Sequence, residues 1–398
     1  MLNPQKLLSR LCVAVSILCL GIILIPRPTL ADVKVKPRII LEEEYNDNWY
    51  RAERNKTTFW VTSVSPGINV EAFTERSFLS LDYGFGYYWH NSQRSSVNGS
   101  GQNYLGHNLG LSAAHRPTSR LTLGLTEEFF LTREPASSDQ FSDIVSRKKY
   151  WRNRVSPSIK YDLAEKGAIT LGYRNERLKW KNPDPGQGDS WENRGIVTLT
   201  YNLNSTNHLD LEQQYWRRSY DAGLSDYDAY QAKLVFRHEF NTYLSGEAGA
   251  GYQRRTFDES GLSNQDSFVF HTTLTGATDR SKLDVSFERN FVDFTTEDQY
   301  FEAYRFDLYA EHIFLEKIRA YLGGYYQNSD YIGSPRKDDT YNGFGGLGYR
   351  FLRDIFELSV EYNYTERGSN ERGRRYKENR VFFRLTTVYD ITEFFTRQ

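Results

Sequence analysis

The stretch LTLGLTEEFFLT, residues 121–132, alternates between two kinds of side chain. Leucine or phenylalanine stands at 121, 123, 125, 129 and 131, and threonine, glycine or glutamate stands at most positions between them. A period of two puts apolar side chains on one face of a strand and polar side chains on the other. The same period runs through Val197–Leu203 and Phe356–Tyr364, and no window has a helical period with caps. The sequence therefore predicts an all-β protein.

About 18 such runs follow one another, each roughly 12–15 residues long, against a mode of about 5–6 residues for soluble strands. Strands of that length suit a tilted passage through a bilayer. Tight connectors such as 202–207 and 240–243 alternate with longer polar ones such as 91–102 and 134–147. This alternation predicts a transmembrane antiparallel up-and-down β-barrel of about 18 strands (16–18), with short periplasmic turns and longer extracellular loops. The first strand is expected over 37–49 and the last over 375–391.

A soluble propeller or a large sandwich would also alternate. Such a fold would hide its apolar face, usually within shorter strands. The spacing here is about 20 residues per strand and connector, whereas a propeller blade repeats every ~40–50 residues. The barrel is therefore the preferred interpretation.

Residues 1–31 have the layout of a secretory signal peptide. Lys6 and Arg10 form a basic start, an apolar run follows from Leu11 to Ile25, and small residues precede a cleavage site after Ala31. A retained membrane anchor is the alternative, but the run is shorter than a span of roughly 20 residues. Residues 32–398 are then expected to form a single outer-membrane β-barrel domain, located in the cell outer membrane.

Composition narrows the classes of function. Both cysteines lie within residues 1–31, so the remainder has no disulfide, thiolate metal site or cysteine nucleophile. That remainder has 47 basic and 51 acidic residues, a net charge of −4 that predicts no nucleic-acid partner. An aromatic share of 15% argues against disorder. The expected partners are outer-membrane lipid, lipopolysaccharide and the barrel-assembly machinery, with polysaccharide or export partners if the barrel serves export.

If the apolar face of each strand meets lipid, the other face lines the lumen. The charged residues predicted for that face are Asp82, Glu128, Lys160, Asp162, Arg174, Glu176, Glu212, Lys233, Arg237, Glu239, Glu247, Lys282, Asp284, Glu288, Arg305, Asp307, Glu311, Glu357, Glu361 and Arg384. Thirteen are acidic and seven are basic, which predicts a weak preference for cations in a water-filled lumen. Alternatively, many of them pair across strands and stiffen the wall.

No residues with catalytic, cofactor-binding or metal-binding spacing are found, so the protein is not expected to be an enzyme or to need a cofactor. The seven histidines lie on separate runs without a metal spacing. Glu127 and Glu128 would form an acid/base pair only if folding brought a third group close. A membrane-embedded hydrolase is therefore the least favoured alternative. The basic tract Arg367–Lys377 is expected in an external loop, either solvated or touching lipopolysaccharide phosphates.

Four short segments resemble a family of outer-membrane β-barrel porins, the porin-2-like proteins often described as exosortase- or exopolysaccharide-associated. They are PRI at Pro37–Ile39, EYNDN at Glu44–Asn48, VSPGI at Val64–Ile68 and its echo VSPSI at Val155–Ile159. The resemblance implies an outer-membrane barrel without catalytic residues. The chain departs from the usual terminal aromatic signal, because three residues follow Phe395.

The preferred function is a porin-like channel for passive passage of small solutes, or for export of an exopolysaccharide. The acidic excess argues against an anionic polymer as cargo. The alternative is a non-conducting barrel that acts as a scaffold or docking site in an envelope or polysaccharide assembly system. Segregated charges on the inner face would favour a pore, and interleaved charges a sealed wall. The longest candidate loop, 134–147, is modest, which favours a monomer.

Overall fold

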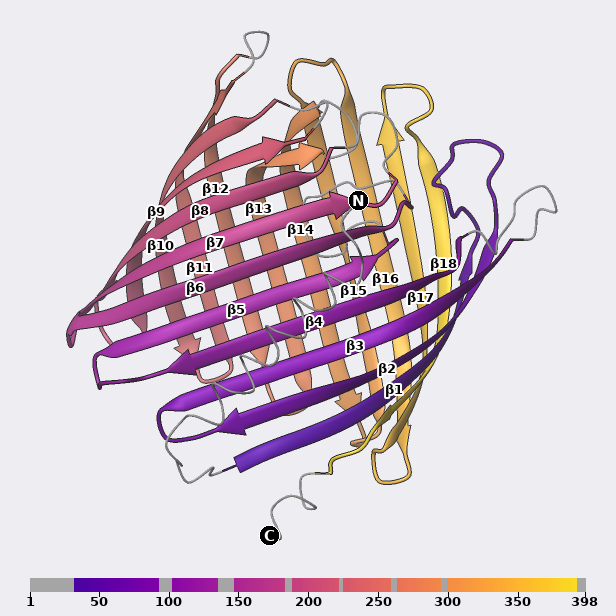
Figure 1. The fold of residues 1–398 in the computed structure, drawn as a ribbon, viewed down its shortest axis with the longest axis horizontal. Coiled ribbons are helices and arrows are strands. Elements are labelled where there is room, and N and C mark those ends of the chain that lie inside the picture. Colours follow the sequence, from indigo (N-terminus) through magenta and orange to yellow (C-terminus); the bar gives the residue numbers. More distant parts are fainter. Residues whose placement is uncertain are drawn as a thin grey trace.

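The computed structural model describes residues 32–92, 102–134, 147–182, 188–221, 225–258, 263–294 and 299–391. Its elements are eighteen β-strands arranged as a barrel (Figure 1). Their bounds are β1 Asp32–Asn46, β2 Phe59–Phe73, β3 Ser77–Ser92, β4 Tyr104–His115, β5 Leu121–Thr132, β6 Tyr150–Ala164, β7 Gly167–Trp180, β8 Ser190–Asn202, β9 Asn207–Tyr220, β10 Tyr227–Asn241, β11 Leu244–Phe257, β12 Gln265–Ala277, β13 Ser281–Phe294, β14 Gln299–Phe314, β15 Ile318–Tyr331, β16 Lys337–Phe351, β17 Phe356–Ser369 and β18 Tyr376–Val388.

Each strand pairs antiparallel with its neighbours in the chain, and β1 pairs with β18 from Arg38↔Val388 to Asn46↔Arg380. That last pairing closes the sheet into a barrel and leaves no free edge. The predicted all-β, 18-stranded, antiparallel barrel is therefore confirmed. In the part of the chain that the structure describes, no helix is long and apolar enough to cross a membrane.

The first strand begins earlier than the sequence indicates, at Asp32 instead of residue 37, and ends at Asn46. Residues 32–37 pair only with β2, because the β18 pairing starts at Arg38. Pro37 has no backbone N–H to donate, but no residue of β18 is paired with it, so no hydrogen bond of that ladder is lost. Its carbonyl accepts from the Tyr389 amide, which follows β18, at 3.1 Å. The proline that seemed to mark a strand start therefore lies inside one. The last strand ends at Val388, and Phe394 and Phe395 lie outside the described residues.

Connector length differs between the two ends of the barrel. Eight turns of two to five residues lie at one end, called the inner end here, together with the start of β1 and the end of β18. Nine connectors join strands at the opposite, outer end, and seven of them are longer, with six to 17 residues: 47–58, 93–103, 133–149, 181–189, 221–226, 258–264 and 370–375. The other two, 295–298 and 332–336, are as short as the inner turns. Short turns face the periplasm in outer-membrane barrels, so the outer end is extracellular.

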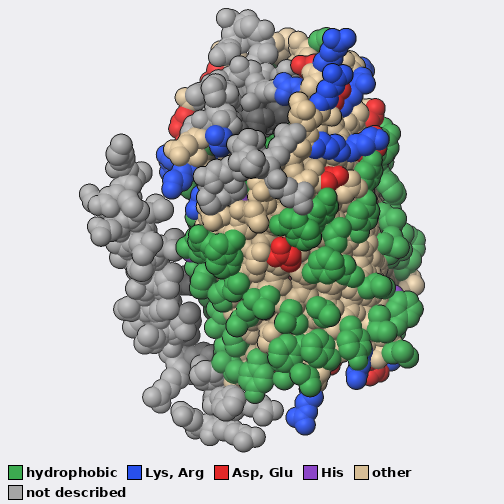
Figure 2. All heavy atoms as spheres, turned by 90° about the vertical axis from the view of Figure 1, so that its right-hand side faces the viewer, with side chains coloured by type: hydrophobic (Ala, Val, Ile, Leu, Met, Phe, Trp, Pro, Cys, Tyr) green, Lys and Arg blue, Asp and Glu red, His purple; other side chains and the backbone are tan. Residues whose placement is uncertain are grey.

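The outward face of the wall is apolar. Leu171, Leu234, Leu322, Leu347 and Phe383 each leave about half of their surface exposed on this face. Figure 2 shows apolar side chains over the middle and lower part of the visible wall, with charged side chains gathered toward the upper end. A soluble sandwich or propeller would bury such a surface, whereas a membrane barrel presents it to lipid.

Candidate functional site

The strand registers place every charged residue predicted for the lumen on the face opposite the exposed apolar side chains. Lys233, for example, pairs with Glu212, while the next residue, Leu234, points outward. On this inward face lie Asp82 on β3, Glu128 on β5, Lys160 and Asp162 on β6, Arg174 and Glu176 on β7, Glu212 on β9, Lys233, Arg237 and Glu239 on β10, Glu247 on β11, Lys282, Asp284 and Glu288 on β13, Arg305, Asp307 and Glu311 on β14, Glu357 and Glu361 on β17, and Arg384 on β18.

Sequence reasoning missed many basic residues of the same face. Among the described strands the registers add Arg38, Arg152, Arg154, Arg194, Arg218, Arg255, Arg319, Arg350, Arg367 and Arg380. They also add seven carboxylates, Glu42, Glu44, Glu71, Glu192, Asp210, Asp338 and Glu378. The inner wall is thus closer to balance in charge, because these additions reduce the acidic excess inferred from the sequence from six residues to three. Strict alternation outward from Trp151 would have identified Arg152 and Arg154.

The signs of charge are interleaved along the inner wall, and ion pairs join strands that are adjacent or separated by one strand. Examples are Arg38–Asp82, Arg319–Glu357 at 2.6 Å, Lys233–Glu212 at 3.2 Å, Arg237–Asp210 at 2.5 Å and Arg384–Glu361 at 3.0 Å. Within single strands, Lys282 pairs with Asp284 at 2.9 Å and Arg305 with Asp307 at 2.8 Å. Cross-strand pairs of opposite charge stabilise the sheet. The lattice expected as the alternative is therefore present.

Burial of the lumen-facing side chains changes along the barrel axis. Near the inner end the side chains of Lys160 and Lys282 remain 49% and 53% exposed. Near the outer end Tyr227 and Asp338 are about 1% exposed, and Glu378 is fully buried. Charged groups become buried only when other groups pack over them and pair with them. The inner half of the lumen is therefore open, and the outer half is largely filled.

One part of this filling is the connector between β1 and β2, residues 47–58, called the inward loop here. Its Trp49 has no exposed surface and packs on Phe59 and His90, with ring centroids 5.1 and 5.0 Å apart. Phe59 lies on the inward face of β2 and His90 on that of β3. The guanidinium of Arg147 stacks 4.0 Å from the centroid of the Trp49 ring, and its Nε atom donates to the backbone carbonyl of Trp49 at 3.1 Å. The loop thus folds into the lumen.

A buried ion network holds the inward loop in place. Glu378, on β18, accepts from Arg51 at 3.0 Å, from Arg147 at 2.9 Å and from Asn46 at 2.8 Å. Arg147 directly precedes β6, and five strands separate β6 from β18 along the wall. Neighbouring strands lie about 4.8 Å apart, so β6 and β18 are far apart along the wall. The contact between Arg147 and Glu378 therefore crosses part of the mouth. It ties together distant parts of the rim.

The network also includes Glu134, which follows β5. Arg147 donates to its carboxylate at 2.8 Å and Arg380 at 3.2 Å. Burial alone would raise the pKa of Glu134, but Arg147 and Arg380 outweigh burial and hold this pKa below its usual value. For Arg51, burial opposes the charged form, and the nearby Glu378 carboxylate more than compensates, so the pKa of Arg51 is raised. Glu134 and Arg51 are therefore both charged at neutral pH.

The outer part of the β13–β14 hairpin also folds into the lumen. β12 pairs with β13 only from Phe270↔Arg289 to Ala277↔Lys282, so β13 leaves the wall beyond Arg289. Tyr300 then packs against Tyr227 and Phe257 of the inward wall, with ring centroids 5.8 and 4.7 Å apart. Its hydroxyl donates to the Ser225 carbonyl at 2.6 Å. The described outer part of this hairpin therefore narrows the outer mouth beside β10 and β11.

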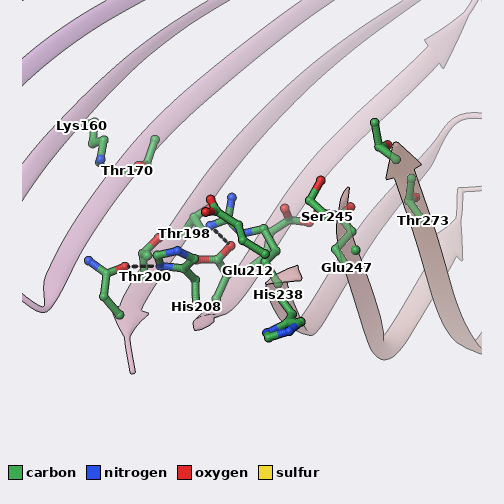
Figure 3. A pocket seen from close by; sticks show the side chains of 16 residues that line it. Lys160, Thr170, Thr198, Thr200, His208, Glu212, His238, Ser245, Glu247 and Thr273 are labelled. Atoms are coloured by element: carbon green, nitrogen blue, oxygen red, sulfur yellow. Dashed lines mark hydrogen bonds and ion pairs between the residues drawn. The ribbon is translucent and has the colours of Figure 1, made fainter. Parts of the chain in front are cut away.

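The inner half contains a polar cavity of about 970 Å³ against β6 to β12 (Figure 3). Threonines such as Thr198 and Thr200 line it beside His208, Asp210 and Arg237. The Asp210 side chain is mostly buried, and its Oδ1 atom has no hydrogen-bond partner among the described residues. Hydroxyl groups can donate and accept hydrogen bonds, so this wall suits hydrated polar solutes.

Chemistry of other kinds finds no support in these residues. No group of histidine, cysteine and carboxylate side chains that could hold a metal ion occurs among the described residues. Glu127 points outward and Glu128 inward, so these two carboxylates do not face each other. The basic tract is divided as well: Arg367 is buried on the inward face, whereas Lys377 faces outward. Only part of this tract is therefore available to lipopolysaccharide.

The closed antiparallel barrel, with its apolar outer band and its polar inner wall, defines an outer-membrane β-barrel protein. The chain belongs to the family described as "Putative beta-barrel porin 2", which matches residues 33–389. It is therefore a porin-like channel protein of the outer membrane and not an enzyme. The match carries no association with exopolysaccharide. No curated protein matches the chain.

Solved structures of outer-membrane channels share the fold at low sequence identity. The crystal structure of Pseudomonas aeruginosa OccK2 (OpdF) matches with a TM-score of 0.51 and 12% identity, covering 91% of this chain and 99% of that chain. The structure of the same protein in complex with glucuronate matches with a TM-score of 0.51 and 10% identity, covering 92% of this chain and 100% of that chain. The crystal structure of Acinetobacter baumannii OccAB2 matches with a TM-score of 0.49 and 10% identity, covering 92% of this chain and 100% of that chain. At these identities the likeness extends to the fold alone.

Proposed function

We propose that this protein passes small hydrophilic solutes passively through a lumen that is wide at its periplasmic half and narrow at its extracellular half. The observation that carries the proposal is the burial gradient, from half-exposed Lys160 and Lys282 to fully buried Glu378. Lumen width and lining charge set what such a barrel passes. The inward loop and the β13–β14 hairpin then act as the size filter.

The charge balance of the inner wall supports weak ion selectivity. The added arginines offset most of the acidic residues, and most charges have a partner within 4 Å. A paired charge attracts mobile ions less than a free one, because its partner cancels most of its field at a distance. This replaces the cation preference predicted from the sequence. Export of a polysaccharide is supported less well, since a polymer would have to displace the inward loop.

A non-conducting scaffold is the second candidate, and the interleaved ion pairs together with the buried network around Glu378 favour it. Planar-bilayer conductance of refolded residues 32–398 separates the two candidates, with the reversal potential measured in a salt gradient. A channel gives stable open steps and a reversal potential close to zero. The control is a variant in which residues 50–56 are replaced by two glycines, which should conduct better.

Silence from both proteins, each shown to be folded by its heat-dependent mobility on a gel, would overturn the channel and leave the scaffold. Swelling of liposomes in glucuronate, the solute named with OccK2, tests passage of a small organic solute. Swelling should be faster with the shortened loop than with the native one. Equal rates would show that the inward loop does not limit passage.

A further inference from the structure

We propose that the inner half of the lumen carries a binding site for a neutral saccharide on the wall formed by β14, β15 and β16. The inference rests on the proposed function and names a class of solute that the channel would hold. Its centre is an aromatic platform made of Tyr309, Tyr321 and Phe344, all three on the inward face and partly exposed. Phe344 is an apolar ring among the polar and charged side chains of this part of the wall.

Two glycines let the rings lie low on the wall, with the plane of Phe344 inclined by 33° to that of Tyr309 and by 53° to that of Tyr321. A Cβ atom added to Gly323 would lie 2.6 Å from Cζ of Phe344, and one added to Gly346 would collide with the Tyr321 ring. Phe344 is the cross-strand partner of Gly323, and Tyr321 that of Gly346. Each ring therefore lies over the bare backbone of the opposite strand instead of standing upright. The Phe344 ring thus packs with one face on the wall and turns its other face toward the lumen, whereas the Arg319 guanidinium lies 4.7 Å from the centroid of the Tyr321 ring.

The three rings form one continuous patch. The centroid of Phe344 is 6.4 Å from that of Tyr309 and 6.4 Å from that of Tyr321. The hydroxyl of Tyr309 donates to Glu311 at 2.6 Å, and the hydroxyl of Tyr321 donates to Glu361 at 2.7 Å. The tyrosine rings are thus held in place before any ligand arrives, which lowers the entropic cost of binding.

Charged groups of both signs surround the rings. Arg319 lies 3.4 Å from Glu311 and 2.6 Å from Glu357, and Arg384 lies 3.0 Å from Glu361. These carboxylates accept hydrogen bonds and these guanidiniums donate them, and their charges nearly cancel. The ligand that matches has an apolar face for the rings and a rim of hydroxyl groups that both donate and accept. A neutral pyranose has this shape, because its axial C–H groups form the face and its hydroxyls form the rim.

The test is calorimetric titration of the folded protein, residues 32–398 in detergent, with maltotriose as the probe. Gly346→Ala pushes the Tyr321 ring off the wall and should weaken binding by about fivefold, since one stacked ring contributes roughly 1 kcal/mol. Gly343→Ala is the matched control, because it lies on the same strand and a Cβ there meets nothing within 4 Å. Its affinity should equal that of the native protein. Phe344→Leu keeps the apolar volume without the flat ring and should lose affinity even if Gly346→Ala does not fold.

No heat of binding from the native protein would overturn the proposal, as would equal loss in Gly346→Ala and Gly343→Ala. Binding of cyclohexanol as tightly as maltotriose would show an apolar site and reject the saccharide. Titration in detergent needs no passage through the barrel. Saccharide binding by a protein that is silent in bilayers would therefore refute the channel and leave this site standing.

Discussion

Glu378 has no exposed surface, and three groups from separate parts of the rim donate to it: Arg51, Arg147 and Asn46. A buried carboxylate stabilises a structure only as long as its partners remain, because an uncompensated buried charge is costly. This residue therefore decides whether the inward loop stays folded against the wall. The sequence shows only a glutamate that alternates with aromatic and basic neighbours, and nothing in it marks this position as central.

Glu378→Gln should release the inward loop. The change leaves Arg51 buried without its countercharge and Arg147 paired with Glu134 alone, at a cost of about 3 kcal/mol. We expect longer open times and higher conductance in planar bilayers. The matched control is Glu366→Gln, on neighbouring β17, where the carboxylate faces outward and pairs with the exposed Lys377. An exposed pair contributes less than about 1 kcal/mol, so this variant should conduct as the native protein does. Equal conductance of both variants would contradict the role of Glu378.

Acid should open the outer mouth through Glu134. Its pKa in the folded loop lies below the usual value, so its contribution to closure is fully present above the unfolded pKa of about 4.3. That contribution is lost as the pH falls through the lower folded pKa. Conductance should therefore stay constant from about pH 8 to pH 5 and rise below about pH 4. Glu134→Gln removes the titrating group and should give high conductance at every pH. A rise in conductance between pH 8 and 6 would point to a different group.

At the scale of the element, the inward loop is the part that the sequence predicts least well. The run 37–49 reads as one strand, whereas the structure ends β1 at Asn46 and turns Trp49 inward. Local alternation does not distinguish an aromatic residue at a membrane interface from one packed in the lumen. The position of Trp49 in the lumen comes from its packing against Phe59, Val61 and His90, whose side chains point inward from β2 and β3.

Trp49→Ala should unfold the inward loop without disturbing the barrel. Removal of a buried tryptophan side chain costs about 3–5 kcal/mol. Hydrogen exchange measured by mass spectrometry should increase across residues 47–58 and stay unchanged in β7 to β12. Tyr50→Ala is the control, because the Tyr50 side chain is 41% exposed and contributes little to the packing. Unchanged exchange in the Trp49 variant would mean that the ion network alone holds the loop.

For the whole molecule, the usual arrangement of a soluble protein is inverted, with leucine and aromatic residues outside and charged residues inside. Among the residues that the structure describes, four small clusters of buried apolar residues replace a single core, and one joins Trp216, Tyr227, Phe257 and Tyr300 at the outer end. Stability therefore depends on the hydrogen-bonded wall and on the lipid around it. Charged substitutions should therefore be tolerated on the lumen face of a strand and not on its lipid face.

Val197→Arg and Thr198→Arg test this inversion at neighbouring positions of β8. Val197 faces outward near the middle of the strand, so arginine there should destabilise the protein in bilayers by about 2–4 kcal/mol. Thr198 lines the polar cavity, and arginine there should cost less than about 1 kcal/mol. The measurement is the free energy of unfolding by guanidinium in phospholipid vesicles. Equal costs at the two positions would mean that the inner face is not hydrated.

The sequence by itself indicated the strands, a number of 16–18 and the face on which each side chain lies, because a period of two is a property of neighbouring residues. It also placed all the predicted lumen residues on one face of the wall. Only the tertiary structure decided how Arg147 meets Glu378, how Phe344 comes to lie over Gly323, and how far the arginines offset the acidic residues. Those contacts join strands that are distant in the chain, and they depend on barrel closure and on a register that no local pattern encodes.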